Sequence, residues 1–311
     1  MLEEQVAHLK ARLAADPENP ELQREFDALL RQLKERSASE PRNAELHKEI
    51  GNLLFHQERF DEAIEAYQKA LEIDPKYYKA LYNLGNTYYK QEQHETAVHY
   101  WHMAIESKPD FDHAFFNLGY HYFQKGLMRE AIRSLREAAR INPTAADTHN
   151  YLGLAYHSTN QLREAIEEFR KAVTLSPDDP DYRYNLANSS YDANDFETAA
   201  NEWQQTLRLR PKDSKARNNY CDALLQLGRL EEALQQIEMV LAEEPDYPPG
   251  LCTKAELLEK LDRKDEAQAL YKRVVGLIEG KENWELLLRY VRRKLFGEPP
   301  EAPVPSNVVP S

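Results

Sequence analysis

The fold of this chain is set by a short stretch that recurs along the sequence, first as FDEAIEAYQKALEIDP at residues 60–75. A proline closes each copy at intervals of 34 residues, at Pro75, Pro109, Pro143, Pro177, Pro211 and Pro245. An alanine column shares this period, at Ala63, Ala97, Ala131, Ala165, Ala199, Ala233 and Ala267. A third column holds small residues, at Gly51, Gly85, Gly119, Gly153, Ala187, Cys221 and Ala255. A fixed period of this length indicates a chain built from stacked structural repeats.

Each repeat contains two apolar stripes with helical spacing. In residues 78–111 the first stripe consists of Leu81, Leu84, Gly85 and Tyr88. The second stripe consists of Ala97, Trp101 and Ala104. Spacings of three and four residues place such side chains on one face of an α-helix. The closing proline has no N–H group and cannot continue a helix, so it ends the second one. We therefore predict an all-α chain of antiparallel helix pairs.

This pattern resembles the tetratricopeptide repeat (TPR) family over residues 44–281, most closely in the first five repeats. The predicted repeats are 44–77, 78–111, 112–145, 146–179, 180–213, 214–247 and 248–281. The resemblance implies a TPR α-solenoid, a right-handed superhelix whose concave wall is lined by the first helix of each pair. The sixth repeat departs from the family pattern at Cys221 and Val240, and the seventh has Glu279 in place of the proline.

The two ends of the chain differ from the repeats. In residues 1–43, one amphipathic helix is expected from Leu2, Val6, Leu9 and Leu13, and a second from Leu22, Phe26, Leu29, Leu30 and Leu33. A third helix, carrying Trp284, Leu287, Leu288, Val291 and Leu295, is expected over 282–296. Because the ends of a solenoid need a polar outer face, we interpret 1–43 and 282–296 as caps. The proline-rich residues 297–311 are predicted to be a disordered tail.

Charge and composition restrict the class of partner. The net charge is −13, which disfavours a general binder of nucleic acid or of anionic membranes. The sequence contains no apolar run long enough to span a bilayer, and it does not open with a secretory signal. Two cysteines, Cys221 and Cys252, do not make a disulfide framework. We therefore expect a cytoplasmic chain without membrane insertion, and a monomer rather than an oligomer.

Asparagine recurs on the first helices, at positions 6 and 9 of the repeat, away from the stripe that packs on the second helix. Position 6 holds Asn83, Asn117, Asn185 and Asn219, and position 9 holds Asn52, Asn86 and Asn188. Tyr151 interrupts the row at position 6, although Asn150 stands beside it. Asparagine is a mediocre helix former, so four at one position in mid-helix suggest a use. Its side chain offers one acceptor and two donors, which match the N–H and C=O groups of an extended peptide.

The row resembles the asparagine ladder in the TPR region of O-GlcNAc transferase, which implies a groove that holds an extended partner. Aromatic and basic side chains complete the predicted face. The predicted binding residues are Lys48, Asn52, Lys79, Tyr82, Asn83, Asn86, Phe116, Asn117, Asn150, Tyr184, Asn185, Asn188 and Asn219. Two alternatives stay open: the asparagines bond across neighbouring helices and only stiffen the stack, and the aromatic side chains belong to the core. Charge also changes along the face, from Lys48, Lys79 and Lys90 to Asp147, Asp181 and Asp192.

The resulting hypothesis is a protein-interaction scaffold with an unidentified protein or peptide partner. A self-assembling structural protein that uses its end caps is the alternative. A co-chaperone binding Hsp70 or Hsp90 tails is a weaker one: Lys48, Asn52 and Asn83 match the start of a carboxylate clamp, but the next repeat has His113 and Asn117 where the clamp needs cations. We find no motif for an enzyme, so we expect no catalytic residue, no metal site and no cofactor.

Overall fold

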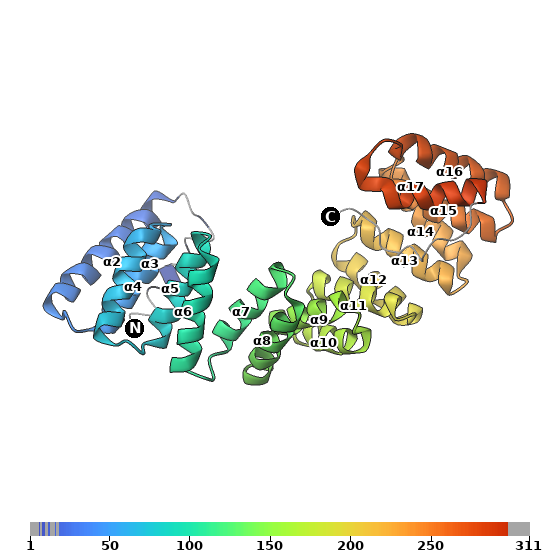
Figure 1. Ribbon diagram of the computed structural model, residues 1–311. Helices are drawn as coiled ribbons and strands as arrows, with labels where there is room; N and C mark the ends of the chain where they lie inside the picture. Colours follow the sequence, from blue (N-terminus) through green and yellow to red (C-terminus); the bar gives the residue numbers. More distant parts are fainter. Residues whose placement is uncertain (1–5, 7, 10–11, 13–15, 17–18, 298–311) are drawn as a thin grey trace. The chain divides into compact units, whose positions relative to one another are not determined.

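The computed structural model describes residues 6, 8–9, 12, 16 and 19–297 of the 311. These residues form helices joined by short turns, and the described part of the chain contains no strand. The chain divides into two compact units, residues 1–144 (the N-terminal unit) and 145–311 (the C-terminal unit). Within each unit, successive helices pack as antiparallel pairs, as Figure 1 shows.

From residue 19 onward, the N-terminal unit holds one long helix followed by three helix pairs. Their bounds are α2 (Pro20–Ser39), α3 (Ala44–His56), α4 (Phe60–Ile73), α5 (Tyr78–Lys90), α6 (His94–Ser107), α7 (Asp112–Gln124) and α8 (Met128–Ile141). The first helix of each pair begins on the first residue of a predicted repeat. Each second helix begins at position 17 of the repeat and ends two residues before the closing proline.

The C-terminal unit continues the same register. Its helices are α9 (Ala146–Ser158), α10 (Leu162–Leu175), α11 (Pro180–Asp192), α12 (Phe196–Leu209), α13 (Ser214–Gln226), α14 (Leu230–Glu243), α15 (Pro248–Lys260), α16 (Lys264–Ile278), η1 (Glu282–Trp284) and α17 (Glu285–Phe296). The all-α architecture of repeated helix pairs predicted from the 34-residue period is therefore confirmed.

A small residue at position 8 lets the two helices of a pair approach each other. A Cβ atom added at Gly51 would lie 2.5 Å from the ring of Tyr67. One added at Gly153 would lie 2.7 Å from the ring of Phe169. These rings occupy position 24 of their repeats and are almost fully buried. The small residue at position 8 and the bulky side chain at position 24 are thus two halves of one contact, which is close-packed like the rest of a protein interior.

The turn inside each pair has its own requirement, at position 15. All seven residues there have a positive φ, at Glu58, Glu92, Gly126, Asn160, Asn194, Gly228 and Asp262. This left-handed conformation is easy for glycine and uncommon for other residues. The sequence analysis missed this position, because four different residue types occupy it and no column is visible.

The first helices of neighbouring repeats also contact each other directly. In the N-terminal unit α3 contacts α5, and in the C-terminal unit α9 contacts α11 and α13 contacts α15. Within a unit, each second helix packs mainly against its own partner and, where the unit continues, against the next helix. Side chains on the first helices therefore meet across repeat boundaries, and this is where the predicted binding residues lie.

The predicted caps are only partly described. Val6 and Leu9 are buried in one cluster with Phe26 and Leu33 of α2, while Leu2 and Leu13 lie outside the described residues. At the other end α17 packs on α16, and its Val291 is fully buried. The predicted tail lies outside the described residues apart from Gly297, which ends α17. The assignment of these ends as caps stays a prediction.

Candidate functional site

The predicted asparagines of the N-terminal unit are joined in pairs across repeat boundaries. Asn83 Nδ2 on α5 donates a hydrogen bond to Asn52 Oδ1 on α3, at 2.7 Å. Asn117 Nδ2 on α7 donates to Asn86 Oδ1 on α5, also at 2.7 Å. Position 6 of one repeat is therefore the donor to position 9 of the repeat before it.

The ring at position 24 holds the accepting asparagine from the other side. The Tyr67 hydroxyl donates to Asn52 Oδ1 at 2.8 Å, and Trp101 Nε1 donates to Asn86 Oδ1 at 2.9 Å. Each accepting carbonyl thus receives two hydrogen bonds, one from its own second helix and one from the next first helix. Three helices are tied together at one amide group.

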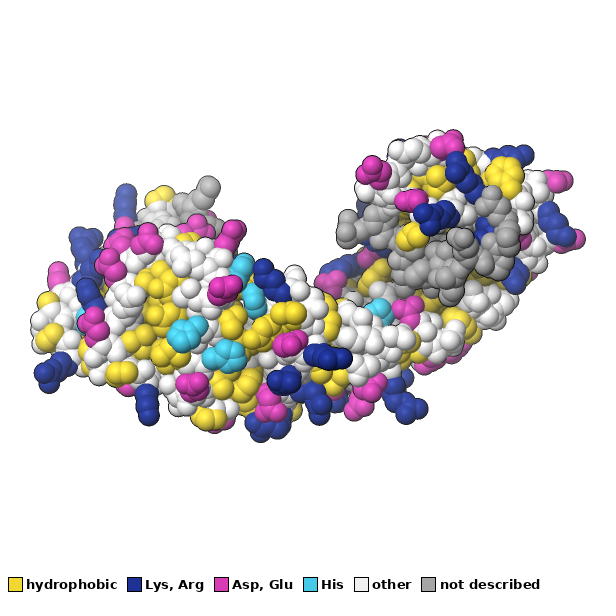
Figure 2. Space-filling model, in the orientation of Figure 1, with side chains coloured by type: hydrophobic (Ala, Val, Ile, Leu, Met, Phe, Trp, Pro, Cys, Tyr) yellow, Lys and Arg dark blue, Asp and Glu magenta, His cyan; other side chains and the backbone are white. Residues whose placement is uncertain are grey.

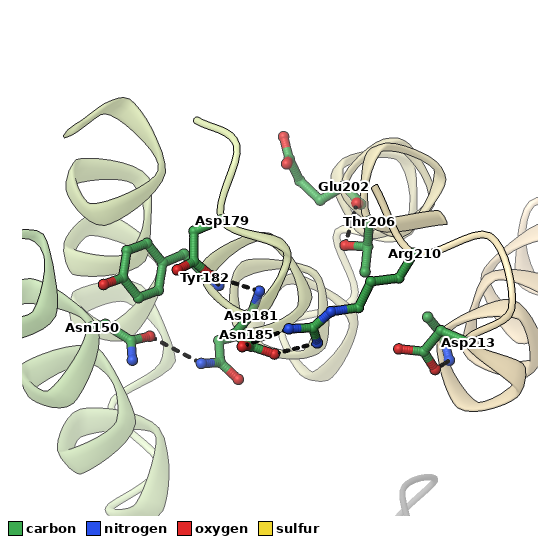
Figure 3. A network of polar contacts seen from close by, with 10 residues as sticks. Asn150, Asp179, Asp181, Tyr182, Asn185, Glu202, Thr206, Arg210 and Asp213 are labelled. Atoms are coloured by element: carbon green, nitrogen blue, oxygen red, sulfur yellow. Dashed lines mark hydrogen bonds and ion pairs between the residues drawn. The ribbon is translucent and has the colours of Figure 1, made fainter. Parts of the chain in front are cut away.

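The row continues in the C-terminal unit with longer bonds. Asn185 Nδ2 donates to Asn150 Oδ1 at 2.9 Å, the contact drawn in Figure 3. Asn219 Nδ2 donates to the Tyr184 hydroxyl at 3.1 Å and lies 3.5 Å from Asn188 Oδ1. The neighbour of Tyr151 named from the sequence, Asn150, is therefore the residue that accepts in the fourth repeat.

These bonds use only part of each donating amide. Asn83, Asn117 and Asn185 are half-buried, and Asn219 is 7 % exposed. Among the hydrogen bonds of the described residues, all four donate through Nδ2, and none of the bonds ends on their Oδ1 atoms. The inter-helix bonds hold each amide in one orientation, which leaves its carbonyl oxygen as the group that can accept another donor.

The predicted aromatic residues are half-buried, between core and surface. The Tyr82 ring meets Phe111 edge-on, with centroids 5.0 Å apart, and its hydroxyl accepts from Asn117 Nδ2 at 3.2 Å. Tyr184 has the equivalent role toward Asn219. Phe116 lies beside Tyr120, with ring centroids 6.4 Å apart. Two of the three therefore support the asparagine row rather than stand clear of it.

The predicted basic residues differ in their exposure. Lys48 is 2 % exposed, and its Nζ forms an ion pair with Glu49, which is equally buried. Asn52 Nδ2 donates to the same Glu49 carboxylate at 3.1 Å. The ammonium of Lys48 is thus turned to its own helix and is not presented at a surface, and we leave Lys48 out of the proposals below. Lys79 is half-buried on α5.

The aspartates that suggested an acidic region in the middle repeats have partners within the C-terminal unit. Arg210 donates two hydrogen bonds to Asp181, at 2.5 and 2.8 Å (Figure 3). The Tyr182 hydroxyl donates to Asp147 at 2.7 Å, and His157 Nε2 lies 2.8 Å from Asp192. All three carboxyl groups thus have polar partners, and the charge of Asp181 is paired with Arg210, which the sequence pattern did not reveal.

Two carboxyl groups that the sequence analysis passed over lie in the same row. Asp222 and Glu256 occupy position 9 of the sixth and seventh repeats, where the first two repeats have asparagine. The Thr253 hydroxyl donates to Asp222 Oδ1 at 2.9 Å, and the Tyr290 hydroxyl donates to Glu256 Oε1 at 2.5 Å. Burial and the neighbouring Glu256 raise the pKa of Asp222 to about 8, and burial raises the pKa of Glu256. The sequence signal that could have identified these two residues is the change from asparagine to an acidic residue at position 9 of the repeat.

The surface of the N-terminal unit is apolar in places. Figure 2 shows hydrophobic and histidine side chains gathered over the region of α4 to α7, with charged side chains around them.

In the described part of the chain, no group of three or more His, Cys, Asp and Glu side chains could hold a metal ion. No described helix is both long and apolar enough to cross a membrane.

Comparison with family models defines the class of protein. The family described as the cilia and flagella-associated protein 70 C-terminal domain matches residues 4–257, and a tetratricopeptide repeat model matches residues 248–280. The first match covers most of the chain, so the chain belongs to that family of TPR proteins. No curated protein sequence matches the chain.

Solved structures share the fold at low sequence identity. YrrB, described as a TPR protein with an unusual peptide-binding site, is 18 % identical with a TM-score of 0.53, over 62 % of this chain and 97 % of YrrB. The pilF protein of Pseudomonas aeruginosa is 16 % identical with a TM-score of 0.52, over 81 % of this chain and 97 % of pilF. A MamA protein is 20 % identical with a TM-score of 0.51, over 56 % of this chain and 95 % of MamA. The fold is a TPR scaffold, which supports a role in protein–protein interaction.

Proposed function

We propose that this chain binds an extended segment of a partner protein and catalyses no reaction. The segment binds to the first-helix face, which is the surface of the first helices that carries the asparagine row. The row consists of Asn52, Asn83, Asn86, Asn117, Asn150, Asn185, Asn188 and Asn219. The observation that carries the proposal is the fixed orientation of Asn83, Asn117 and Asn185, each held through Nδ2. Their carbonyl oxygens receive no hydrogen bond within the described chain. An extended segment supplies backbone N–H donors that need such acceptors.

The bonds between helices favour binding as well as stiffness. A side chain that is already immobilised loses little conformational entropy when a ligand arrives, so pre-organisation strengthens binding. The half-buried Tyr82 and Phe116 add apolar surface beside the amides of the same face. The peptide-binding site named for YrrB belongs to a protein of the same fold, and it adds a precedent for peptide recognition by such repeats.

The test obtains ligands directly, although the natural partner is unidentified. A display library of random linear peptides is panned against the full chain, and the affinity of each enriched peptide is measured by fluorescence anisotropy. The same peptides are then measured against single and combined variants Asn83→Ala, Asn117→Ala, Asn185→Ala and Asn219→Ala. We expect each substitution to weaken binding by about 0.5–1.5 kcal/mol, the usual net contribution of one hydrogen bond.

Asparagine variants also lose a bond between helices, so a control matched for stability is needed. Val173→Ala on α10 removes half-buried apolar contacts on a second helix, away from the asparagine row. If it lowers the melting temperature as much as Asn117→Ala but leaves peptide affinity unchanged, the loss of affinity belongs to the asparagine. Equal affinity losses in both variants would contradict the proposal, as would a library that yields no peptide sensitive to the four asparagines.

A further inference from the structure

We infer that the segment bound on the first-helix face carries a lysine or arginine side chain that is received by Asp222 and Glu256, at the sixth and seventh repeats. The inference rests on the proposed function and specifies the chemistry of the partner at one place. It is carried by the position of the two carboxyl groups, by their lack of a cationic partner, and by an unpaired buried oxygen of Asn218 beside Asp222.

The two carboxyl groups belong to the asparagine row by position. Asp222 on α13 and Glu256 on α15 take the place that Asn52 and Asn86 take in the first two repeats. Asp222 accepts from Thr253 of the next first helix, just as Asn52 accepts from Asn83. At this end of the chain the row therefore continues in the same geometry, with neutral amides replaced by acids.

Several other carboxylates of the C-terminal unit form salt bridges, and these two do not. Arg210 pairs with Asp181, and Lys294 Nζ pairs with Glu259 at 2.7 Å, one turn from Glu256. Among the described residues, no Lys, Arg or His side chain forms a salt bridge with Asp222 or Glu256. Lys260 and Lys294 favour the charged form of Glu256 from a distance, and nothing comparable acts on Asp222.

A polar atom beside the carboxyl groups also lacks a partner. Asn218 is 4 % exposed, its Nδ2 donates to Asp222 Oδ2 at 3.4 Å, and its Oδ1 has no hydrogen bond. Buried polar atoms are rarely left unpaired, so this oxygen marks a site that a ligand completes.

A basic side chain supplies both the missing positive charge and a donor for the unpaired polar atom. Burial first, and then repulsion by the neighbouring Glu256, raise the pKa of Asp222, because no cation offsets its charge. An ammonium or guanidinium group supplies several N–H donors and a positive charge, which satisfy carboxyl groups that lack a cation. The carbonyl of Asn218, held at Asp222, is a further acceptor for the same group.

The experiment uses the random peptide library on three forms of the full chain. The first is the unchanged chain, and the second is Asp222→Asn/Glu256→Gln, which restores neutral amides of the kind found in other repeats. The third is a control, Glu231→Gln/Glu243→Gln, which removes the same charge from α14, outside the row. Asparagine is already accommodated at position 9 in three other repeats, so the second form is expected to fold, as circular dichroism melts will check.

We expect lysine or arginine to be enriched at one peptide position on the unchanged chain and on the control, and not on the second form. The affinity of a selected peptide should fall on the order of tenfold in the second form, and replacing its basic residue by norleucine should cost nothing further there. Peptides that depend on the four asparagines but show no basic position, or that bind the second form equally well, overturn this inference and leave the proposed function standing. Peptides indifferent to the asparagines overturn both.

Discussion

At the scale of single residues, the ring at position 24 determines how firmly the asparagine row is held. Trp101 Nε1 donates to Asn86, whereas the indole N–H of Trp203 has no hydrogen-bond partner. Both rings are almost fully buried. Two tryptophans in the same repeat position thus make different polar contacts, and the weaker bond of Asn219 to Asn188 occurs in the repeat of the unpaired one.

This difference predicts unequal effects of the same substitution. Trp101→Phe and Trp203→Phe remove the same atoms from similarly buried positions, but only Trp101→Phe breaks a hydrogen bond. We expect the free energy of unfolding to fall about 1 kcal/mol further for Trp101→Phe, as measured by urea denaturation. Equal losses for the two variants would show that the indole bond to Asn86 adds nothing.

Asp222 predicts a pH dependence of stability. Its folded pKa of about 8 lies above the value of an unfolded aspartate, about 3.9, so the folded chain binds more protons between these values. Stability should therefore fall as the pH rises from about 4 to about 8, and change no further through this group above that range. Thermal melts across this window should show a smaller decline for Asp222→Asn. The exposed Asp178→Asn serves as the control, and a decline equal to that of the unchanged chain in both variants would contradict the prediction.

At the scale of helices, the contact between glycine at position 8 and the side chain at position 24 sets the distance within the pairs of the first four repeats. Gly85 and Gly119 repeat what Gly51 and Gly153 show, with an added Cβ lying 2.7 Å from Trp101 and 2.5 Å from Leu135. Side-chain volume at one position of the first helix is therefore limited by one side chain of the second. Gly276 is also in a helix, yet an added Cβ there meets nothing within 4 Å.

These two environments predict opposite effects of one substitution. Gly153→Ala forces the ring of Phe169 to move, and overpacking of this kind costs about 1–3 kcal/mol. Gly276→Ala meets no neighbour, and alanine is the better helix former, so we expect a gain of about 0.5–1 kcal/mol. Denaturant unfolding of both variants measures the difference, and a Gly153→Ala chain as stable as the original would mean that the pair is loosely packed.

At the scale of the whole molecule, stability comes from contacts between neighbours. Within each unit, the main contacts of a helix are with its own partner and with the adjacent helices. Chains of this kind behave as one-dimensional arrays, in which a local defect weakens the nearest repeats first. The partner segment, in contrast, is proposed to contact several repeats. A mutation should therefore destabilise only the repeats next to it, whereas binding depends on residues in several repeats.

Hydrogen exchange tests this local character. Trp101→Ala should cost about 3–5 kcal/mol through the cavity it leaves. We expect faster amide exchange in α5, α6 and α7, and unchanged exchange in α13 to α16. A uniform acceleration along the whole chain would show that the array unfolds as one cooperative unit.

Periodicity in the sequence was enough to establish the helix pairs and the TPR class. These features depend on side chains within one repeat, such as Gly51 against Tyr67, and local periodicity records such contacts directly. The same periodicity placed the asparagines on the first helices, away from the packed stripe. The left-handed turn residues at position 15 escaped notice, because glutamate, asparagine, aspartate and glycine all occupy it.

Which atoms of the row are already bonded, and which charges are paired, emerged only from the stacked helices. Asn83 bonds to Asn52, Asp181 to Arg210 and Tyr290 to Glu256, pairs separated by about one repeat along the chain. Which side chains form these hydrogen bonds depends on how successive repeats pack together and on side-chain rotamers. The sequence of a single repeat determines neither. For the same reason the burial of Lys48 against Glu49 and the lack of a cation at Asp222 became visible only in the tertiary structure.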